Sequence, residues 1–127
     1  MTAPLRMLTW DQLAAARPDM VATMRAYLTQ IGCVLRPGSV MGADQALRSL
    51  AQFLLAEHPH IEQVAQIDRP QIEGYKPWLA ARPGQNRPRI TPATIAHRLG
   101  TLRMFFLRID EWGWDDAPAR VPMFPGD

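Results

Sequence analysis

Side chains suited to holding phosphates gather at the start of one long segment, residues 91–112. Thr91 can cap a first helical turn, and Pro92 fits the first helical position because it has no N–H to leave unpaired. The polar side chains of the first turns and of the loop before them are Arg87, Arg89, Thr94, His97, Arg98 and Thr101. A helix N-terminus favours phosphates, and arginine can form paired hydrogen bonds with phosphate or guanine. The same arginines could instead belong to an ordinary solvated surface.

A second segment has the same local chemistry. Ser39 follows the turn Arg36-Pro37-Gly38, and we expect it to cap a helix over residues 40–58. Side chains in the first two turns of such a helix can reach base edges when phosphates hold its end. The sequence therefore contains two helix starts that each follow a basic turn.

Other kinds of site have little support. The three histidines, His58, His60 and His97, lack the cysteines or the His-Glu-x-x-His spacing of a metal site. The segment that contains Gly38 and Gly42 lacks the lysine and hydroxyl pair of a nucleotide-binding loop. No nucleophile, base and orienting group occur together in the sequence. We therefore expect no metal, no cofactor and no enzymatic activity within these 127 residues.

Composition is typical of one small domain, with 47% hydrophobic and 20% charged residues in 127. Residues 36–108 carry ten basic and five acidic side chains, whereas residues 110–127 carry one basic and five acidic. A basic body suits a polyanionic partner. Thirteen of the fourteen basic residues are arginines, which suits phosphate contacts but is also typical of a GC-rich genome. A lone cysteine, Cys33, and no signal or membrane segment indicate a cytoplasmic protein without membrane contact.

The apolar spacing predicts an all-α domain of four to five helices. Beyond the helix over 40–58, we expect helices over residues 18–34 and 70–81. Asp68 should cap the second of these, and Pro77 should kink it or shorten its first part. In the segment 91–112, the stripe facing the core is Ile95, Leu99, Leu102, Phe106 and Ile109. We expect Gly113 to end this helix in a left-handed conformation.

The order of these motifs resembles one family. Its pattern comprises Ser39, Leu47, Phe53-Leu54, Ile67 to Ile72, Tyr75, Leu79, Thr91 to Ile95, Leu99, Leu102 to Phe106, Trp112 to Trp114 and Pro118. This is similar to the N-terminal core-binding, SAM-like domain of tyrosine recombinases, which include phage integrases and related transposases. The resemblance implies a SAM-like orthogonal bundle over residues 18–113, preceded by an N-terminal arm (1–17) and followed by a linker (114–127) toward a C-terminal catalytic domain.

The resemblance also implies a function. Such a domain clamps double-stranded DNA for integration or recombination, while the catalytic residues belong to the C-terminal domain. Neither Tyr27 nor Tyr75 is therefore expected to be the nucleophile. By this resemblance the DNA-contacting residues are Ser39, Arg48, Arg87, Arg89, Thr91, Thr94, His97, Arg98 and Arg103. The loop arginines and the hydroxyls would hold phosphates, and His97 and Arg98 would read bases.

Other recombinase protomers would be further partners when assembled on DNA, and the bound protein would be associated with the nucleoid. An alternative is a helical protein–protein interaction module that does not bind DNA. In that case the apolar face of the helix over residues 18–34 could dock a neighbouring protein. Arg103 could likewise pair with an acidic neighbour in the core instead of contacting DNA.

Overall fold

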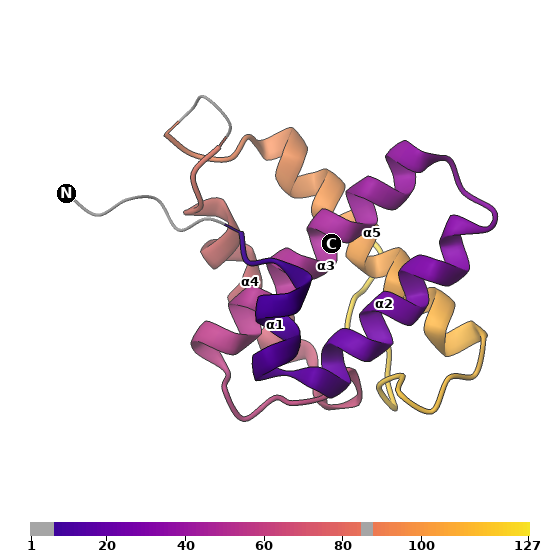
Figure 1. Ribbon diagram of the computed structural model, residues 1–127. Coiled ribbons are helices and arrows are strands. Elements are labelled where there is room, and N and C mark those ends of the chain that lie inside the picture. Colours follow the sequence, from indigo (N-terminus) through magenta and orange to yellow (C-terminus); the bar gives the residue numbers. More distant parts are fainter. Residues whose placement is uncertain (1–6, 85–87) are drawn as a thin grey trace.

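The computed structural model describes residues 7–84 and 88–127, and Arg87 lies outside them. The described residues form an all-α bundle, as the sequence predicted (Figure 1). Its elements in chain order are α1 (Trp10–Ala16), α2 (Pro18–Gly32), α3 (Pro37–Glu57), the 3-10 turn η1 (Val64–Gln66), α4 (Arg69–Ala80) and α5 (Pro92–Glu111). None of these helices is long and apolar enough to cross a membrane.

The start of α3 corrects one prediction. We expected Ser39 to be the cap of a helix starting at residue 40, but the helix begins three residues earlier, with Pro37 as its first residue and Arg36 as the N-cap. Proline suits this position because its fixed φ is already helical and its missing N–H would have no partner there. Ser39 is therefore the third residue of α3, exposed to solvent, with its amide bonded to the Arg36 carbonyl at 3.0 Å.

The predicted start and end of α5 are confirmed. Thr91 is the N-cap, and its side chain accepts a hydrogen bond from the Thr94 amide at 3.2 Å. Gly113 follows the last turn with φ of 71°, a conformation that costs a residue with a Cβ about 1–2 kcal/mol. Its amide bonds the Asp110 carbonyl, and the Trp114 amide bonds the Ile109 carbonyl, both at 3.1 Å. This pair of bonds is the Schellman motif, which satisfies carbonyls that the helix end leaves free.

The Asp68 cap of α4 is also confirmed, and it forms a reciprocal capping box with Gln71. The helix passes through Pro77 and ends at Ala80. On α5 the predicted core stripe is correct: four of its five members are buried and Ile95 is half-buried. Phe105 joins the stripe and packs edge-on against Tyr27 of α2, with ring centroids 4.8 Å apart. Full burial of each large side chain contributes roughly 1.5–3 kcal/mol, so the stripe fixes how α5 lies on the bundle.

Segments at both ends of the described chain pack on the helices. In α1, Leu13 is buried and the Trp10 indole donates to Asp44 of α3 at 2.8 Å. Beyond α5, Met123 is buried and the Asp127 carboxylate accepts hydrogen bonds from two cations of α4. The division into arm, body and linker stays a prediction, but residues 7–16 and 114–127 both contact the bundle.

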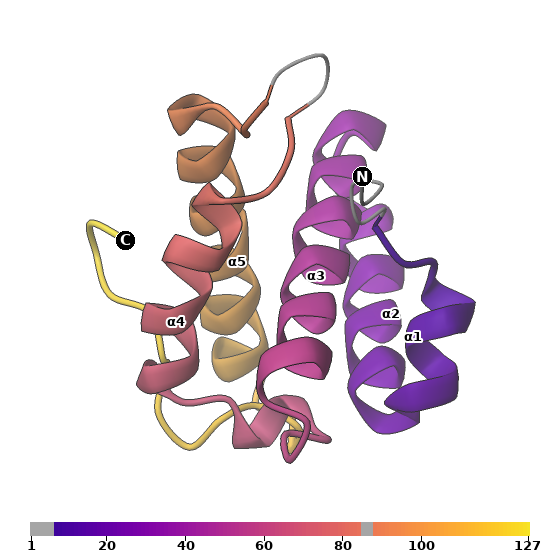
Figure 2. The ribbon, with the colours of Figure 1, turned by 90° about the vertical axis from the view of Figure 1, so that its left-hand side faces the viewer.

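The arrangement of α3, α4 and α5 positions the candidate site. Figure 2 shows that α3 and α5 begin at the same end of the bundle, where the loop from α4 to α5 also lies. The base of this loop is closed by a hydrogen bond of 2.9 Å from the Ile90 amide to the Arg82 carbonyl. A Cβ on Gly84 would lie only 2.6 Å from the Arg89 carbonyl oxygen, so the two sides of the loop touch. The described ends of the loop are therefore held together next to the start of α5.

Candidate nucleic-acid interface

The first turn of α5 presents two hydroxyl groups, and the amides of Thr94 and Ile95 already have partners. Pro92 has no N–H, the Thr94 amide bonds the Thr91 hydroxyl, and the Ile95 amide bonds the Thr91 carbonyl at 3.0 Å. The two threonine hydroxyls are themselves 3.0 Å apart. An anion at this helix start would therefore be held mainly by side chains, with the helix dipole adding a favourable field.

Close contact between α3 and α5 positions the imidazole of His97. A Cβ added to Gly42 of α3 would lie 3.1 Å from Nε2 of His97. The absence of a side chain at Gly42 thus lets the second turn of α5 approach the second turn of α3. His97 is exposed at this crossing, in the second turn of α5.

A groove of about 370 Å³ lies between the two helix starts and the closed loop. Its lining comprises Gln45 of α3, Pro83, Gly84 and Ile90 of the loop, and Thr91, Thr94 and Arg98 of α5. We call it the outer groove. It brings together three of the residues that the sequence predicted, Thr91, Thr94 and Arg98, and its described lining contains no carboxylate.

A smaller pocket of about 130 Å³ adjoins the outer groove and shares Arg98 and Pro83 with it. We call it the Arg82–Arg98 pocket. Its lining comprises Met7, Ser49, Gln52, Trp78, Arg82, Pro83 and Arg98. Arg82 is fixed here because its Nε donates to the Trp78 carbonyl at 3.2 Å and its guanidinium carbon lies 4.3 Å from the centre of the indole ring.

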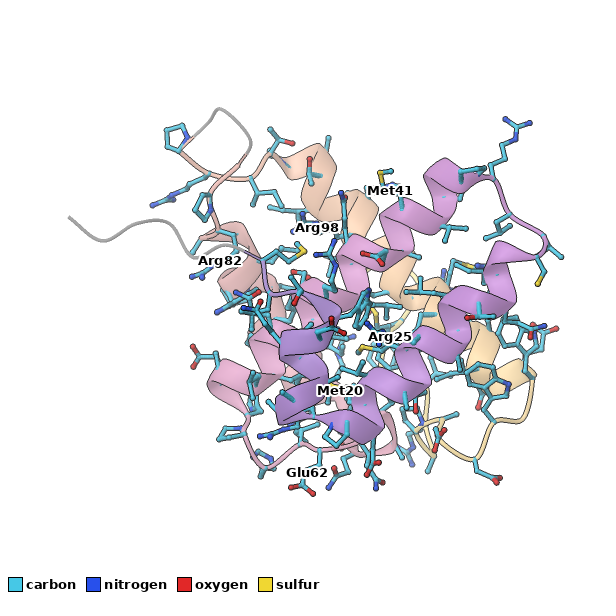
Figure 3. All side chains as sticks on the ribbon, viewed as in Figure 1. Met20, Arg25, Met41, Glu62, Arg82 and Arg98 are labelled. Carbon is cyan, nitrogen blue, oxygen red and sulfur yellow. The ribbon has the colours of Figure 1, made fainter. Side chains whose placement is uncertain are left out.

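The arginines of this end differ in whether an acidic residue neutralises them. Arg82, Arg89 and Arg98 form no ion pair with any carboxylate of the described residues. Figure 3 shows Arg82 and Arg98 toward the loop end of the bundle, with Glu62 at the opposite end. Three uncompensated positive charges beside the N-terminus of α5 give this surface a positive potential that attracts phosphates.

Two predicted site residues, Arg48 and Arg103, do not line the outer groove. Arg48 pairs with Asp44 through its Nε at 2.7 Å, and Asp44 also accepts the Trp10 indole. Its charge is thus largely neutralised within the bundle. Arg103 lies beyond the turns that line the outer groove, and its Nε is buried without a hydrogen-bond partner among the described residues. The pairing with an acidic neighbour that we considered for Arg103 is absent from that part of the chain.

The sequence prediction missed Gln45, Trp78 and Arg82. One signal for two of them was present: Trp78 and Arg82 are four residues apart, the spacing at which side chains meet on a helix. The position of Gln45 on the wall of the outer groove follows only from the way α3 packs against α5. A pattern read along one helix cannot show it.

Tyr75 lies directly beneath this end of the bundle. It is fully buried, and its hydroxyl is 2.7 Å from the hydroxyl of Ser49. Burial raises the pKa of Tyr75 to about 12, although the Ser49 hydrogen bond and the positive charge of Arg98 oppose that shift. The phenol therefore stays protonated at neutral pH.

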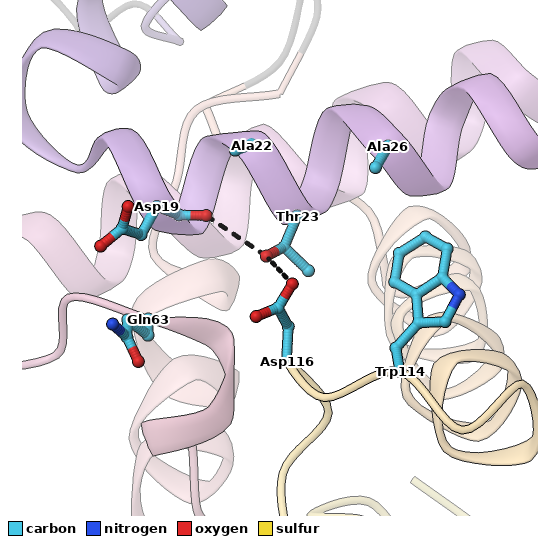
Figure 4. A pocket seen from close by; sticks show the side chains of 7 residues that line it. All are labelled: Asp19, Ala22, Thr23, Ala26, Gln63, Trp114 and Asp116. Carbon is cyan, nitrogen blue, oxygen red and sulfur yellow. Dashed lines mark hydrogen bonds between the residues drawn. The ribbon is translucent and has the colours of Figure 1, made fainter.

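Another groove of the described residues has the opposite character. It measures about 510 Å³ and lies between α2 and the segment after α5 (Figure 4). Its lining comprises Asp19, Ala22, Thr23, Ala26, Gln63, Trp114 and Asp116. The Thr23 hydroxyl lies 3.1 Å from the Asp116 carboxylate and 3.2 Å from the Asp19 carbonyl. Two carboxylates make this surface, which we call the α2 groove, unsuited to phosphate.

Comparison with known proteins finds similarity to transposases of Staphylococcus aureus. Transposase B from transposon PsiTn554 is 31% identical over 83 residues, which are 65% of this chain and 12% of the relative. Transposase B from transposon Tn554 of strains Mu50 and N315 is 29% identical over 83 residues, with the same coverage. The chain thus matches only about an eighth of the length of these relatives. No family model matches the chain, and no solved structure matches it.

Proposed function

We propose that this chain is a DNA-binding domain of a transposase or a related site-specific recombinase. The observation that carries the proposal is the loop end of the bundle, where α5 begins beside Arg82, Arg89 and Arg98, three arginines that no described carboxylate neutralises. Similarity to part of two transposases supports a role in DNA recombination. Together these features favour duplex DNA as the partner.

The geometry suggests how the duplex would lie. Arg89 and the Thr91 and Thr94 hydroxyls line or flank the start of α5, where they can hold phosphates. His97 and Gln45 lie where α3 and α5 approach each other, and both side chains can hydrogen bond to base edges in a major groove. Phosphate contacts would position the bundle, and these two side chains would supply sequence preference.

We further propose that the chain is the core-binding, SAM-like domain of a tyrosine recombinase and that strand exchange is carried out by a separate catalytic domain. The burial of both tyrosines supports a separate catalytic domain, because Tyr27 and Tyr75 are at most 1% exposed. Neither hydroxyl can reach a DNA phosphate without unfolding the core. Contacts with other protomers on DNA belong to the same proposal.

Fluorescence anisotropy with a short random duplex over a salt series tests the DNA-binding proposal. If three phosphates are neutralised, affinity falls about 40-fold between 50 and 200 mM salt, because log K falls by about 0.9 per phosphate for each log unit of salt. The double variant Arg89→Gln plus Arg98→Gln is expected to bind more weakly and to reduce the salt slope by about two. Arg120→Gln is the matched control, since it removes an exposed arginine beside the connector before α4.

A second candidate function rests on the α2 groove. Its small side chains, Ala22 and Ala26, and its two carboxylates suit a basic segment of another protein. A helical interaction module without DNA binding would show no anisotropy change at low salt. It would also be insensitive to loss of Arg89 and Arg98.

A further inference from the structure

We propose that the Arg82–Arg98 pocket is a phosphate site that receives one backbone phosphate of the bound DNA. The inference rests on the proposed function, and it extends that function to residues that the resemblance did not indicate. It also changes the expectation for Arg98, which would hold a phosphate rather than read a base. Three features of the pocket support it: a fixed arginine fork, a hydroxyl donor beneath it and a size that suits one phosphate.

The fork is the guanidinium of Arg82. Its Nε is already bonded to the Trp78 carbonyl, and its plane lies against the indole at 4.3 Å. A cation held on an aromatic face loses little further side-chain freedom when it binds a ligand. The two terminal amino groups, which have no partner among the described residues, are thus available to bind two oxygens of a phosphate.

The donor beneath the fork is the pair of hydroxyls of Ser49 and Tyr75. These two groups carry two hydrogens, and the 2.7 Å bond between them uses one. Because Tyr75 stays protonated, the pair cannot repel an anion as a phenolate would. Ser49 is 3% exposed and lines the pocket, so its hydrogen is available to an acceptor there when Tyr75 donates to it.

Arg98 completes the site from α5. It lines the pocket and acts on the buried Tyr75 as a nearby positive charge. No carboxylate occurs in the described lining, so two arginines face the pocket without a counterion. When no DNA is bound, the positive charges of Arg82 and Arg98 repel each other, which is electrostatically unfavourable. An incoming phosphate removes that repulsion.

The size of the pocket limits the ligand. Its volume of about 130 Å³ is far below the roughly 300–1,000 Å³ of pockets that enclose small molecules. A phosphate group with a few waters fits, whereas a nucleobase or a whole nucleotide does not. The pocket opens beside the outer groove, so a strand lying along that groove can place one phosphate in it.

Two measurements test the assignment. The first is an NMR titration with inorganic phosphate that follows the Trp78 indole and the Arg82 and Arg98 side-chain signals. We expect saturable shifts that weaken several-fold in Arg82→Gln and in Ser49→Ala. The second is DNA anisotropy over a salt series, in which we expect Arg82→Gln to lower affinity about tenfold and the salt slope by about one.

Arg120→Gln is the control in both measurements. Arg120 lies near Asp68 at the start of α4, whereas Arg82 follows the far end of that helix, which is about 18 Å long. If Arg82→Gln matches Arg120→Gln on DNA while the wild type binds DNA, the assignment is overturned and the proposed function stands. If the wild type fails to bind DNA at low salt but phosphate still titrates the pocket, the proposed function fails and the site is one for free phosphate. Shifts at Arg82 no larger than those at Arg120 would also overturn the site.

Discussion

Thr91 allows stability and DNA binding to be changed in opposite directions. Its side chain caps α5 through the Thr94 amide, and it also lines the outer groove. We expect Thr91→Ala to remove the cap and lower the free energy of unfolding by about 1 kcal/mol. For a chain of this size that lowers the melting temperature by about 3–6 °C.

Thr91→Asp should have the reverse effect on stability. Aspartate is at least as good a cap as threonine, and its charge interacts favourably with the helix dipole by about 0.3–1 kcal/mol. The same charge would repel DNA phosphates and neutralise Arg98, which lines the same groove. We therefore expect the Asp variant to be as stable as the wild type or more stable, yet to bind DNA at least tenfold more weakly.

Thr91→Ser is the matched control, since it keeps the hydroxyl and the cap. Thermal unfolding by circular dichroism and duplex binding by anisotropy should then rank the Thr91 variants in different orders. Stability is expected to rank Asp, then Ser and Thr, then Ala, whereas affinity should rank Thr and Ser, then Ala, then Asp. Equal affinity of the Asp and Ser variants would refute the reasoning, because it would mean that phosphates do not approach the start of α5.

Three further substitutions test other parts of the structure. Gly42→Ala should raise the free energy of unfolding by about 0.5–1 kcal/mol in chemical denaturation, because helix propensity improves and the exposed His97 can rotate away from the new methyl group. If Gly42→Ala gave no gain in a protein that also carries His97→Ala, this reasoning would be contradicted. Gly84→Ala should loosen the loop, since its Cβ would lie 2.6 Å from a backbone oxygen, and weaker DNA binding with faster amide exchange at Ile90 would show it. Hydrogen bonds from its cationic partners hold the pKa of Asp127 well below its ordinary value of 3.8, so it stabilises the docked tail above that pH and less as the pH falls. Asp127→Asn should abolish this acid dependence in the amide exchange of the tail, and an unchanged pH profile would contradict the assignment.

The sequence predicted those features that local chemistry decides. The start, the stripe and the end of α5 depend on Thr91, on apolar spacing and on Gly113, all within one segment. The predicted start of α3 was wrong by three residues because a proline at position 37 is compatible with two local structures, a break after one helix or the first turn of the next. Both are consistent with the sequence, and packing of α2 on α3 selects the second.

The candidate site was harder to predict because its parts come from distant segments. Ser49 and Tyr75 are 26 residues apart, and only the packing of α3 on α4 brings their hydroxyls together. Arg48 illustrates the converse, since it was predicted to contact DNA but is paired with Asp44 four residues earlier. Its i,i+4 spacing could have indicated this, whereas the lack of a partner for Arg98 could be found only from the fold.

The distribution of acidic residues among the helix starts supports the same end of the bundle as the binding surface. Acidic side chains in a first turn stabilise a helix by about 0.3–1 kcal/mol, and α1 and α2 have one each, Asp11 and Asp19. Neither α3 nor α5 has an acidic residue in its first turn. These are the two helices that begin beside the outer groove, where such a carboxylate would stabilise the helix but repel a phosphate. α4 begins at the other end of the bundle and also has no acidic residue in its first turn, but its N-cap is Asp68. A requirement for stability alone would not leave only α3 and α5 without a carboxylate at their starts, whereas a requirement to bind a polyanion at one end of the bundle does.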